Sequence, residues 1–132
     1  MGALAGGCLC GAHRYRITAT PLHAVICHCR TCRRAAGAQS VGWLTVASDG
    51  LAWETGAPVA FASSPGIIRT HCATCGTSLT YRCEPDSIDV TLASLDDPEA
   101  VPPAREVWLS RKLAWEPAAP GLPGFPERGS GA

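Results

Sequence analysis

Cysteine is the residue type whose number and spacing in this sequence point most directly to chemistry. The chain has 132 residues, and eight of them are cysteines. Seven form three tight clusters: Cys8 with Cys10, Cys27 with Cys29 and Cys32, and Cys72 with Cys75. This density indicates either a disulfide framework or metal-bound thiolates. The first residues carry no basic region and no apolar run of signal-peptide length, so we expect a cytoplasmic, reducing location and metal binding.

The first and third clusters predict one closed, structural zinc site. Residues two apart in a strand project from the same face, so Cys8 and Cys10 are expected to direct two sulfurs at one ion. Cys72 and Cys75, followed by Gly76, have the spacing of a zinc knuckle. Two such pairs complete a tetrahedral centre with four cysteine ligands, which leaves no position for a substrate.

The middle cluster predicts a second, open zinc site. Cys27, Cys29 and Cys32 offer three sulfurs close together in the chain, and three protein ligands with a free position are typical of catalytic zinc. His28 lies between two cysteines that share a face, so its side chain is expected to point away from their metal. We therefore expect the three cysteines to form the catalytic site.

Other roles for the cysteines fit the sequence less well. Disulfides require an oxidising compartment, and the spacings of ferredoxin-type iron–sulfur proteins differ from these clusters. A redox-active pair at Cys72 and Cys75 belongs with a βαβ pattern, which this sequence lacks. The eighth cysteine, Cys83, follows Tyr81 in a predicted strand, and we expect it to be a small buried thiol.

The elements that must position the cysteines are predicted to be mostly short antiparallel strands. Segments rich in Val, Ile, Thr, Tyr and Trp show alternation and are broken by Gly, Pro, Ser or Asp. We expect strands at 12–18, 39–46, 59–63, 67–71, 78–83 and 87–95. A helical turn is expected at 30–36, where Gly37 can end it, and a second one at 97–101.

Composition predicts one small domain followed by a tail. A hydrophobic fraction of 46% is sufficient for a compact core. After Trp115 the chain has four prolines and four glycines and no apolar periodicity. We therefore expect a zinc-binding domain at 1–115 and a Pro/Gly-rich tail at 116–132, either a docking strip for an aromatic groove or a stiff segment on its own or a neighbouring subunit. Assembly into a homo-oligomer is left open.

Charge and hydropathy argue against two classes of partner. Lys+Arg and Asp+Glu number 11 each, so the formal net charge is zero. Without a basic surplus to neutralise phosphates, binding to nucleic acid is not expected. No window approaches the roughly 20 apolar residues that a membrane-spanning helix needs, so no membrane insertion is expected.

Several segments extend the cysteine spacing into a more specific pattern. They are 7–11 with Tyr15, 27–33 with Gly37, 72–79, 95–98 and 107–115. From Gly7 to about Trp115 the sequence resembles the glutathione-dependent formaldehyde-activating enzyme family, which also contains centromere protein V. Two features depart from the family pattern: His71, where a Phe is usual, and the tail after Trp115.

The resemblance implies a β-tent fold stabilised by zinc, with one or two short helical turns. It implies two zinc ions, one structural and one open. The structural ion is assigned to residues matching Cys8, Cys10, Cys72 and Cys75, and the open ion to those matching Cys27, Cys29 and Cys32. It further implies that glutathione and formaldehyde are joined as S-(hydroxymethyl)glutathione, which is formally a carbon–sulfur lyase reaction run in reverse.

In such a reaction the open zinc would act as a Lewis acid for the thiol or the aldehyde. Arg30, Arg33 and Arg34 surround the middle cluster, where they could pair with the carboxylates of glutathione or, as solvated turn residues, offset thiolate charge. Two other functions remain open. One is a non-catalytic zinc module that binds a partner protein, and the other is a related activity on another small thiol or aldehyde.

Overall fold

The computed structural model describes residues 4–128, which fold into two sheets, one α-helix and three short 3-10 helices, η1 (Ser48–Gly50), η2 (Leu92–Ser94) and η3 (Leu109–Arg111). The smaller sheet contains β1 (Leu4–Gly7), β2 (Arg14–Ile17) and β5 (Leu51–Trp53). The larger sheet contains β3 (His23–Cys27), β4 (Val41–Ala47), β6 (Val59–Ser64), β7 (Ile67–His71), β8 (Ser78–Glu84), β9 (Ser87–Thr91) and β10 (Arg105–Val107).

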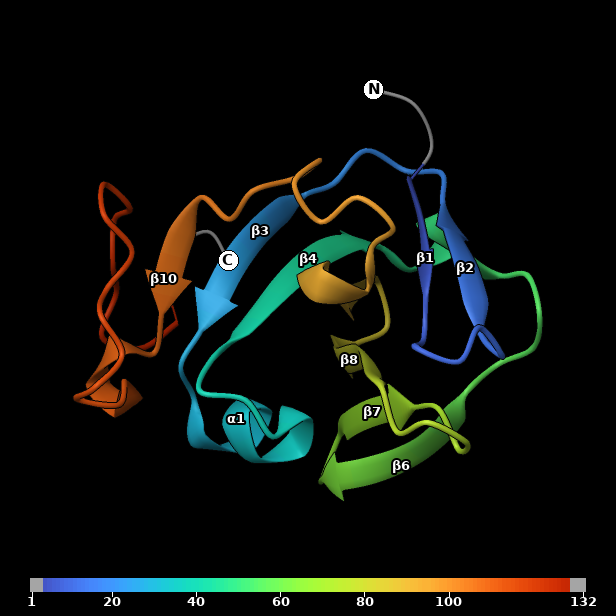
Figure 1. Cartoon of the computed structure of the whole chain (residues 1–132), viewed down its shortest axis with the longest axis horizontal. Coiled ribbons are helices and arrows are strands. Elements are labelled where there is room, and N and C mark those ends of the chain that lie inside the picture. Colours follow the sequence, from blue (N-terminus) through green and yellow to red (C-terminus); the bar gives the residue numbers. More distant parts are fainter. Residues whose placement is uncertain (1–3, 129–132) are drawn as a thin grey trace.

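Most neighbouring strands run antiparallel. The smaller sheet has the order β1-β2-β5, and the larger sheet has the order β10-β3-β4-β9-β8-β7-β6. The pair of β10 and β3 is parallel. The prediction of a small, mostly β domain with mainly antiparallel strands is therefore confirmed (Figure 1).

The two faces of the larger sheet have different roles. On one face Ala24, Leu44 and Val90 are buried in the main hydrophobic core, which also takes in residues of the smaller sheet. On the other face Val25 and Trp43 belong to a second core, which contains the middle cysteine cluster. Because side chains alternate between the faces of a strand, β3 and β4 both hold the fold together and position the cysteines.

The predicted helix is α1 (Arg30–Ala36), which lies at the end of β3. Cys29 is its N-cap, and the Cys29 sulfur accepts a hydrogen bond from the Cys32 amide at 3.4 Å. Gly37 ends the helix with φ = 65°, a left-handed conformation that glycine adopts without a steric penalty. The cap sulfur and the helix start therefore belong to the same cysteine cluster.

Four strands were not predicted from the sequence pattern: β1, β3, β5 and β10. The segments Leu-Ala-Gly-Gly of β1 and Arg-Glu-Val of β10 are short and have weak strand signals, and β3 is an apolar segment without alternation. Pairing stabilises the short strands, because β1 lies against β2, which follows it in the sequence, and β10 lies against the distant β3.

The second predicted helix, at 97–101, is wrong. The segment forms a single turn in which the Asp97 side chain accepts a hydrogen bond from the Glu99 amide at 3.1 Å. Pro102 and Pro103 follow at once and prevent further helical hydrogen bonds. A short 3-10 turn is present instead at Leu92–Ser94, directly after β9.

Residues beyond Trp115 lie against their own chain as far as Arg128. The Phe125 amide donates to the Glu106 carbonyl at 3.0 Å, and the Glu106 amide donates to the Pro123 carbonyl at 2.9 Å. Phe125 also packs on the second core. Figure 1 shows this segment on the outer side of β10. Packing in the described part of the chain therefore continues past residue 115, through backbone pairing rather than through a regular strand.

Gly6 allows the smaller sheet to approach the η2 turn, Leu92–Ser94. It forms an isolated bridge with Leu95, and the fully buried Tyr15 places its hydroxyl 2.7 Å from Ser94 Oγ in the same region. A Cβ atom on Gly6 would overlap both the Ser94 carbonyl oxygen and the Tyr15 hydroxyl. The contact between the two parts of the fold requires a residue without a side chain here.

Replacing Gly6 with alanine is therefore expected to destabilise the protein by about 1–3 kcal/mol, the usual cost of overpacking a close contact. Gly37→Ala is the matched control, since its Cβ would enter open space and only the left-handed backbone is penalised, by about 1–2 kcal/mol. Urea unfolding of both variants measures the difference. Equal stabilities of the Gly6 variant and the wild type would contradict the close approach.

Within residues 4–128, no helix has the length and apolar character that a membrane crossing demands.

Candidate metal centres

The first centre brings together two cysteine pairs that are far apart in the sequence. The sulfurs of Cys8, Cys10, Cys72 and Cys75 all lie within 4.8 Å of one another. Two of the separations are 3.6 Å, between Cys8 and Cys10, and 3.7 Å, between Cys10 and Cys72. Tetrahedral zinc with Zn–S bonds of ~2.3 Å requires sulfurs ~3.8 Å apart. The donor set and its dimensions therefore fit one zinc ion.

Backbone amides around this four-cysteine centre stabilise the thiolates. The His13 amide donates to Cys8 Sγ at 3.3 Å, and the Cys75 amide donates to Cys72 Sγ at 3.4 Å. Hydrogen bonds from Thr77 lower the pKa of Cys75 to about 5. The expectation that the first pair lies in a strand was wrong. The pair occupies the turn after β1, and this turn brings both sulfurs close to that of Cys72, with Cys8 buried and Cys10 exposed.

The second centre is formed by the end of β3 and the start of α1. The sulfurs of Cys27, Cys29 and Cys32 lie within 4.8 Å of one another. Cys27 and Cys32 are buried, and Cys29 is partly exposed. Three sulfurs in this arrangement fit a zinc ion that keeps one position open. Among residues 4–128, no His, Asp or Glu ligand atom completes the group.

Contacts among the three sulfurs distribute their negative charge unevenly. Hydrogen bonds from Cys27 and Cys32 hold the pKa of Cys29 far below its ordinary value, to about 2. The pKa of Cys27 is raised, first by its contact with Cys29 and then by its contact with Cys32 and by burial. Among the three sulfurs, these contacts therefore favour the ionised form most at Cys29, which lies at the helix N-terminus.

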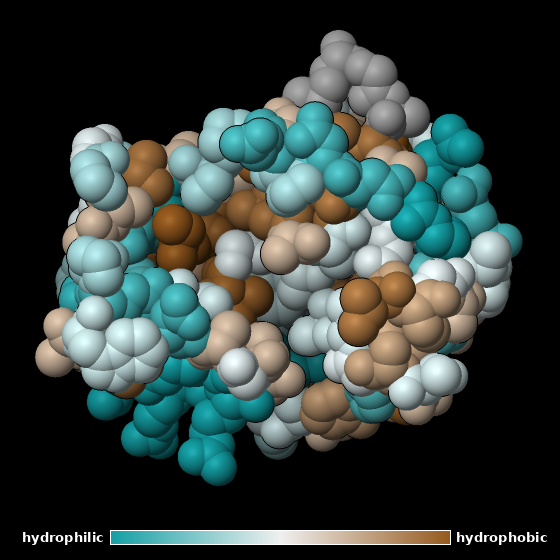
Figure 2. Space-filling view, in the orientation of Figure 1, coloured by the Kyte–Doolittle hydropathy of each residue, from teal (hydrophilic) through white to brown (hydrophobic). Residues whose placement is uncertain are grey.

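A cavity of about 180 Å³ opens directly onto the three-cysteine centre. All three cysteines line it, together with Arg69, Tyr81 and Arg128. A larger cavity of about 560 Å³ borders the four-cysteine centre instead, on the side of Gly7, Cys8 and the end of α1. The face shown in Figure 2 is hollowed near its middle, with hydrophobic residues at the border of the hollow. Since a four-cysteine centre has no open position, the smaller cavity is the candidate site of chemistry.

The chain has recognisable relatives in sequence and in fold. Residues 3–111 match the family described as glutathione-dependent formaldehyde-activating enzyme. The chain belongs to this family. A crystal structure of a Rhodobacter sphaeroides protein has the same fold, with a TM-score of 0.60 and 20% sequence identity, over 92% of this chain and 98% of that one. No curated protein gives a significant match.

Two parts of the family pattern outside the cysteine clusters, Tyr15 and the segment 95–98, lie where the smaller sheet meets the chain that follows β9. Arg14 in β2 makes a two-point contact with the carboxylate of Asp96, at 2.9 and 2.5 Å. Tyr15 contacts Ser94, and Leu95 bridges to Gly6. These contacts fix the strand that leads into the four-cysteine centre.

The three arginines expected near the substrate lie on α1, but none of them lines the 180 Å³ cavity. Arg33 donates from Nη1 to the carbonyl oxygens of His28 at 3.1 Å and Arg111 at 2.7 Å. Arg30 and Arg34 are exposed. Arg33 therefore stabilises the loop that carries the cysteines.

Sequence reasoning missed Arg69, which lies in β7 three residues before Cys72. Arg69 is buried and lies next to Cys32. Its burial and this contact depend on the pairing of β7 with β8 rather than on local sequence. The one local signal was an arginine that follows two apolar residues, Ile67 and Ile68, inside a predicted strand.

The expectation that Cys83 is a small buried thiol was wrong, because this residue is exposed near the end of β8, where it lines the 180 Å³ cavity. A register shift between Tyr81 and Glu84 interrupts the pairing of β8 with β9 at this point.

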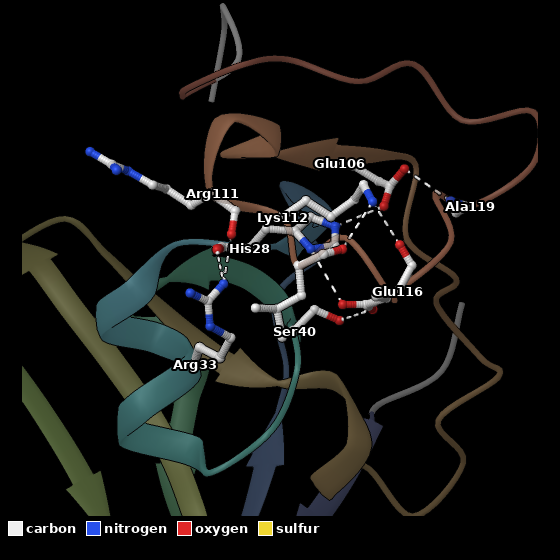
Figure 3. Close-up of polar contacts among 9 residues, drawn as sticks. His28, Arg33, Ser40, Glu106, Arg111, Lys112, Glu116 and Ala119 are labelled. Atoms are coloured by element: carbon white, nitrogen blue, oxygen red, sulfur yellow. Dashed lines mark hydrogen bonds and ion pairs between the residues drawn. The ribbon is translucent and has the colours of Figure 1, made fainter.

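His28 points away from the cysteines and into a buried polar cluster (Figure 3). Its Nε2 lies 2.8 Å from Glu106 Oε1, and its Nδ1 lies 3.6 Å from Glu116 Oε1. The second oxygens of the two carboxylates accept hydrogen bonds from the Ala119 amide at 3.0 Å and from Ser40 Oγ at 2.7 Å. Residues from β10 and the C-terminal segment thereby hold the peptide between Cys27 and Cys29 in place.

Glu106→Leu is expected to reduce stability by about 1–3 kcal/mol, because leucine leaves both His28 Nε2 and the Ala119 amide without their hydrogen-bond partner. Glu99→Leu, in an exposed turn, is the control and should change the free energy of unfolding by less than about 0.5 kcal/mol. Urea unfolding of the metal-loaded proteins tests this; equal losses in the two variants would contradict the role of the cluster.

Proposed function

We propose that the chain is a zinc-dependent enzyme that joins a small thiol to an aldehyde, with glutathione and formaldehyde as the pair to test first. The observation that supports this best is the cavity that opens onto a centre with three sulfurs, while the other centre has four. Family membership supports the same reaction class. The product would be S-(hydroxymethyl)glutathione, so the reverse reaction is that of a carbon–sulfur lyase.

The proposed cofactors are two zinc ions. Cys8, Cys10, Cys72 and Cys75 would hold the structural ion, and Cys27, Cys29 and Cys32 would hold the second. At the second centre a bound zinc ion supplies a Lewis acid that favours the ionised form of the thiol.

Residues of the chain exclude water from the site and hold the reactants. Formation of the product makes one carbon–sulfur bond and converts the aldehyde carbonyl into a hydroxyl. The proton that the thiol loses is balanced by the proton that the carbonyl oxygen gains, so no further reactant is needed. Trp43 and Val107 form an apolar wall of the cavity, which excludes water and holds both reactants close together. Tyr81 and Thr31 place hydroxyl groups at the same cavity.

The size of the cavity limits how a tripeptide thiol would bind. At about 180 Å³, it is smaller than the roughly 300–1,000 Å³ of most ligand pockets. We infer that only the thiol end and the aldehyde enter, while the rest of the substrate lies across the rim. Arg128 at the rim and the exposed Arg30 and Arg34 on α1 are the proposed contacts for its carboxylates.

Exchange spectroscopy with ¹³C-labelled formaldehyde tests the proposal. The zinc-loaded protein should accelerate exchange between hydrated formaldehyde and S-(hydroxymethyl)glutathione, and S-methylglutathione should show no adduct. Acceleration with another thiol but not with glutathione would keep the reaction class and change the substrate. Absence of acceleration with every thiol, in protein that holds two zinc ions, would contradict the proposal and favour a non-catalytic zinc module.

A further inference from the structure

Arg69 is a buried cation fixed against the three-cysteine centre. Only 4% of the residue is exposed. Its Nη1 and Nη2 lie 3.8 and 3.7 Å from Cys32 Sγ. Nη2 also donates to Thr31 Oγ1 at 3.4 Å, and Nε donates to Ser63 Oγ at 3.1 Å. The guanidinium stacks over the Tyr81 ring, with Cζ 4.7 Å from the ring centroid.

The position of Arg69 requires a negative charge nearby. A guanidinium stays protonated in proteins, and a buried charge is costly unless an opposite charge accompanies it. Within residues 4–128, no carboxylate makes an ion pair with Arg69. Asp89, which lines the same cavity, accepts a hydrogen bond from Thr45 at 2.6 Å. The sulfurs of the three-cysteine centre are therefore the anionic groups that Arg69 faces.

The charges of the arginine and the centre match. Three thiolates and one divalent ion have a net charge of −1, which Arg69 offsets. A thiolate that enters the cavity adds a second negative charge beside Cys32. In a buried site, where the effective dielectric constant is low, one fixed cation at this distance has a large effect on such an anion.

We propose that Arg69 is the positioning residue that makes this centre accept its substrate as a thiolate anion. Arg69 would keep Cys32 in place, and because it offsets the −1 charge of the centre, the incoming thiolate meets a neutral group instead of an anionic one. The inference rests on the proposed function in one respect, that the ligand is a thiol, and it defines the ligand class as an anionic sulfur compound rather than a thioether or an alcohol. Removal of an outer partner of a metal ligand typically lowers metal affinity or activity about 10- to 100-fold, and we expect a loss of similar size in the affinity for the thiol.

Thiol binding to the full chain tests this independently of turnover. The protein is loaded with cobalt, and 2-mercaptoethanol and glutathione are titrated while the sulfur-to-cobalt charge-transfer band is followed; S-methylglutathione serves as the thioether. The variants are Arg69→Gln, Arg69→Lys and Arg16→Gln. The last removes an exposed arginine of the smaller sheet that pairs with Glu54 at 3.1 Å. Metal content and circular dichroism are measured for each protein.

We expect Arg69→Gln to weaken thiol binding about 10- to 100-fold, Arg69→Lys to recover part of it, and Arg16→Gln to match the wild type. Wild-type affinity in Arg69→Gln would overturn the inference. If Arg69→Gln loses the metal or does not fold, the inference is tested with Arg69→Lys, which keeps the positive charge. This variant must bind both metal and thiol, and its failure to do so would overturn the role of the charge. Thiol binding without turnover in the wild type would contradict the proposed function and leave this inference standing.

Discussion

Replacing Cys32 with serine is expected to reduce glutathione-dependent formaldehyde conversion at least about 100-fold. Cys32 is 5% exposed, lies in the first turn of α1, and its sulfur contacts both of the other cysteines and Arg69. Serine is a poor zinc ligand at neutral pH, so the second centre should lose its metal. The fold should persist, since the main hydrophobic core and the four-cysteine centre are untouched. Exchange spectroscopy measures the rate, and metal analysis should show one zinc ion per chain in place of two.

Cys83→Ser is the control for metal content, because it makes the same chemical change at an exposed thiol outside both centres, so two zinc ions should remain. Since Cys83 lines the cavity, the control for activity is Ala35→Ser, which places a serine at an exposed position of α1 outside both centres and both cavities. Ala35→Ser should keep most of the activity. An unchanged rate in Cys32→Ser, with loss of one zinc ion demonstrated, would show that the three-cysteine centre is not the site of the reaction. In that case the larger cavity beside Cys8 would be the next site to test.

Replacing Cys72 with serine should have the largest effect on stability. Cys72 is 1% exposed and joins the turn after β1 to the loop between β7 and β8. Structural zinc sites of this kind contribute about 10–16 kcal/mol of binding free energy to folding. We expect the variant to lose at least about 4 kcal/mol of stability, and its Tm to fall by at least roughly 15 °C. Thermal unfolding followed by circular dichroism, with one zinc ion fewer per chain, measures this.

Metal removal gives an independent check of the same centre. A strong chelator removes the ions of both centres, so it should lower the Tm of the wild type at least as far as Cys72→Ser does. With the chelator present, the wild type and Cys72→Ser should unfold at similar temperatures, because neither then has a four-cysteine zinc site. Cys83→Ser should behave as the wild type throughout. A Tm that is unaffected by either the substitution or the chelator would mean that the four-cysteine centre does not stabilise the fold.

Local sequence was sufficient for the features in which a few neighbouring residues determine the geometry. The turn that follows Cys29 became α1, because a cap at one end and Gly37 at the other define a short helix. The pairing of two cysteines with two others more than 60 residues away also follows from ligand count, since a tetrahedral site needs four sulfurs. The metal itself and the reaction remain proposals.

Pairing between segments far apart in the sequence determined the features that local patterns did not predict. β3 pairs with β4 from His23 to Cys27, and β10, which has no strong pattern of its own, is a strand because it lies beside β3. The same pairing holds His28 against Glu106 and brings the C-terminal segment back over β10. Cys83 lies near the end of β8, where pairing with β9 is irregular, so a cysteine in an alternating segment is exposed.

The sequence by itself determined which cysteines group together, because chain geometry limits where sulfurs two or three residues apart can point. Only the tertiary structure decided what surrounds them. Arg69 contacts Cys32 because β7 lies beside β8 in a particular register, and a shift by one residue would turn its side chain to the other face of the sheet. The environment of the three-cysteine centre is therefore a property of the assembled sheet, whereas the cysteine clusters are already defined by their spacing.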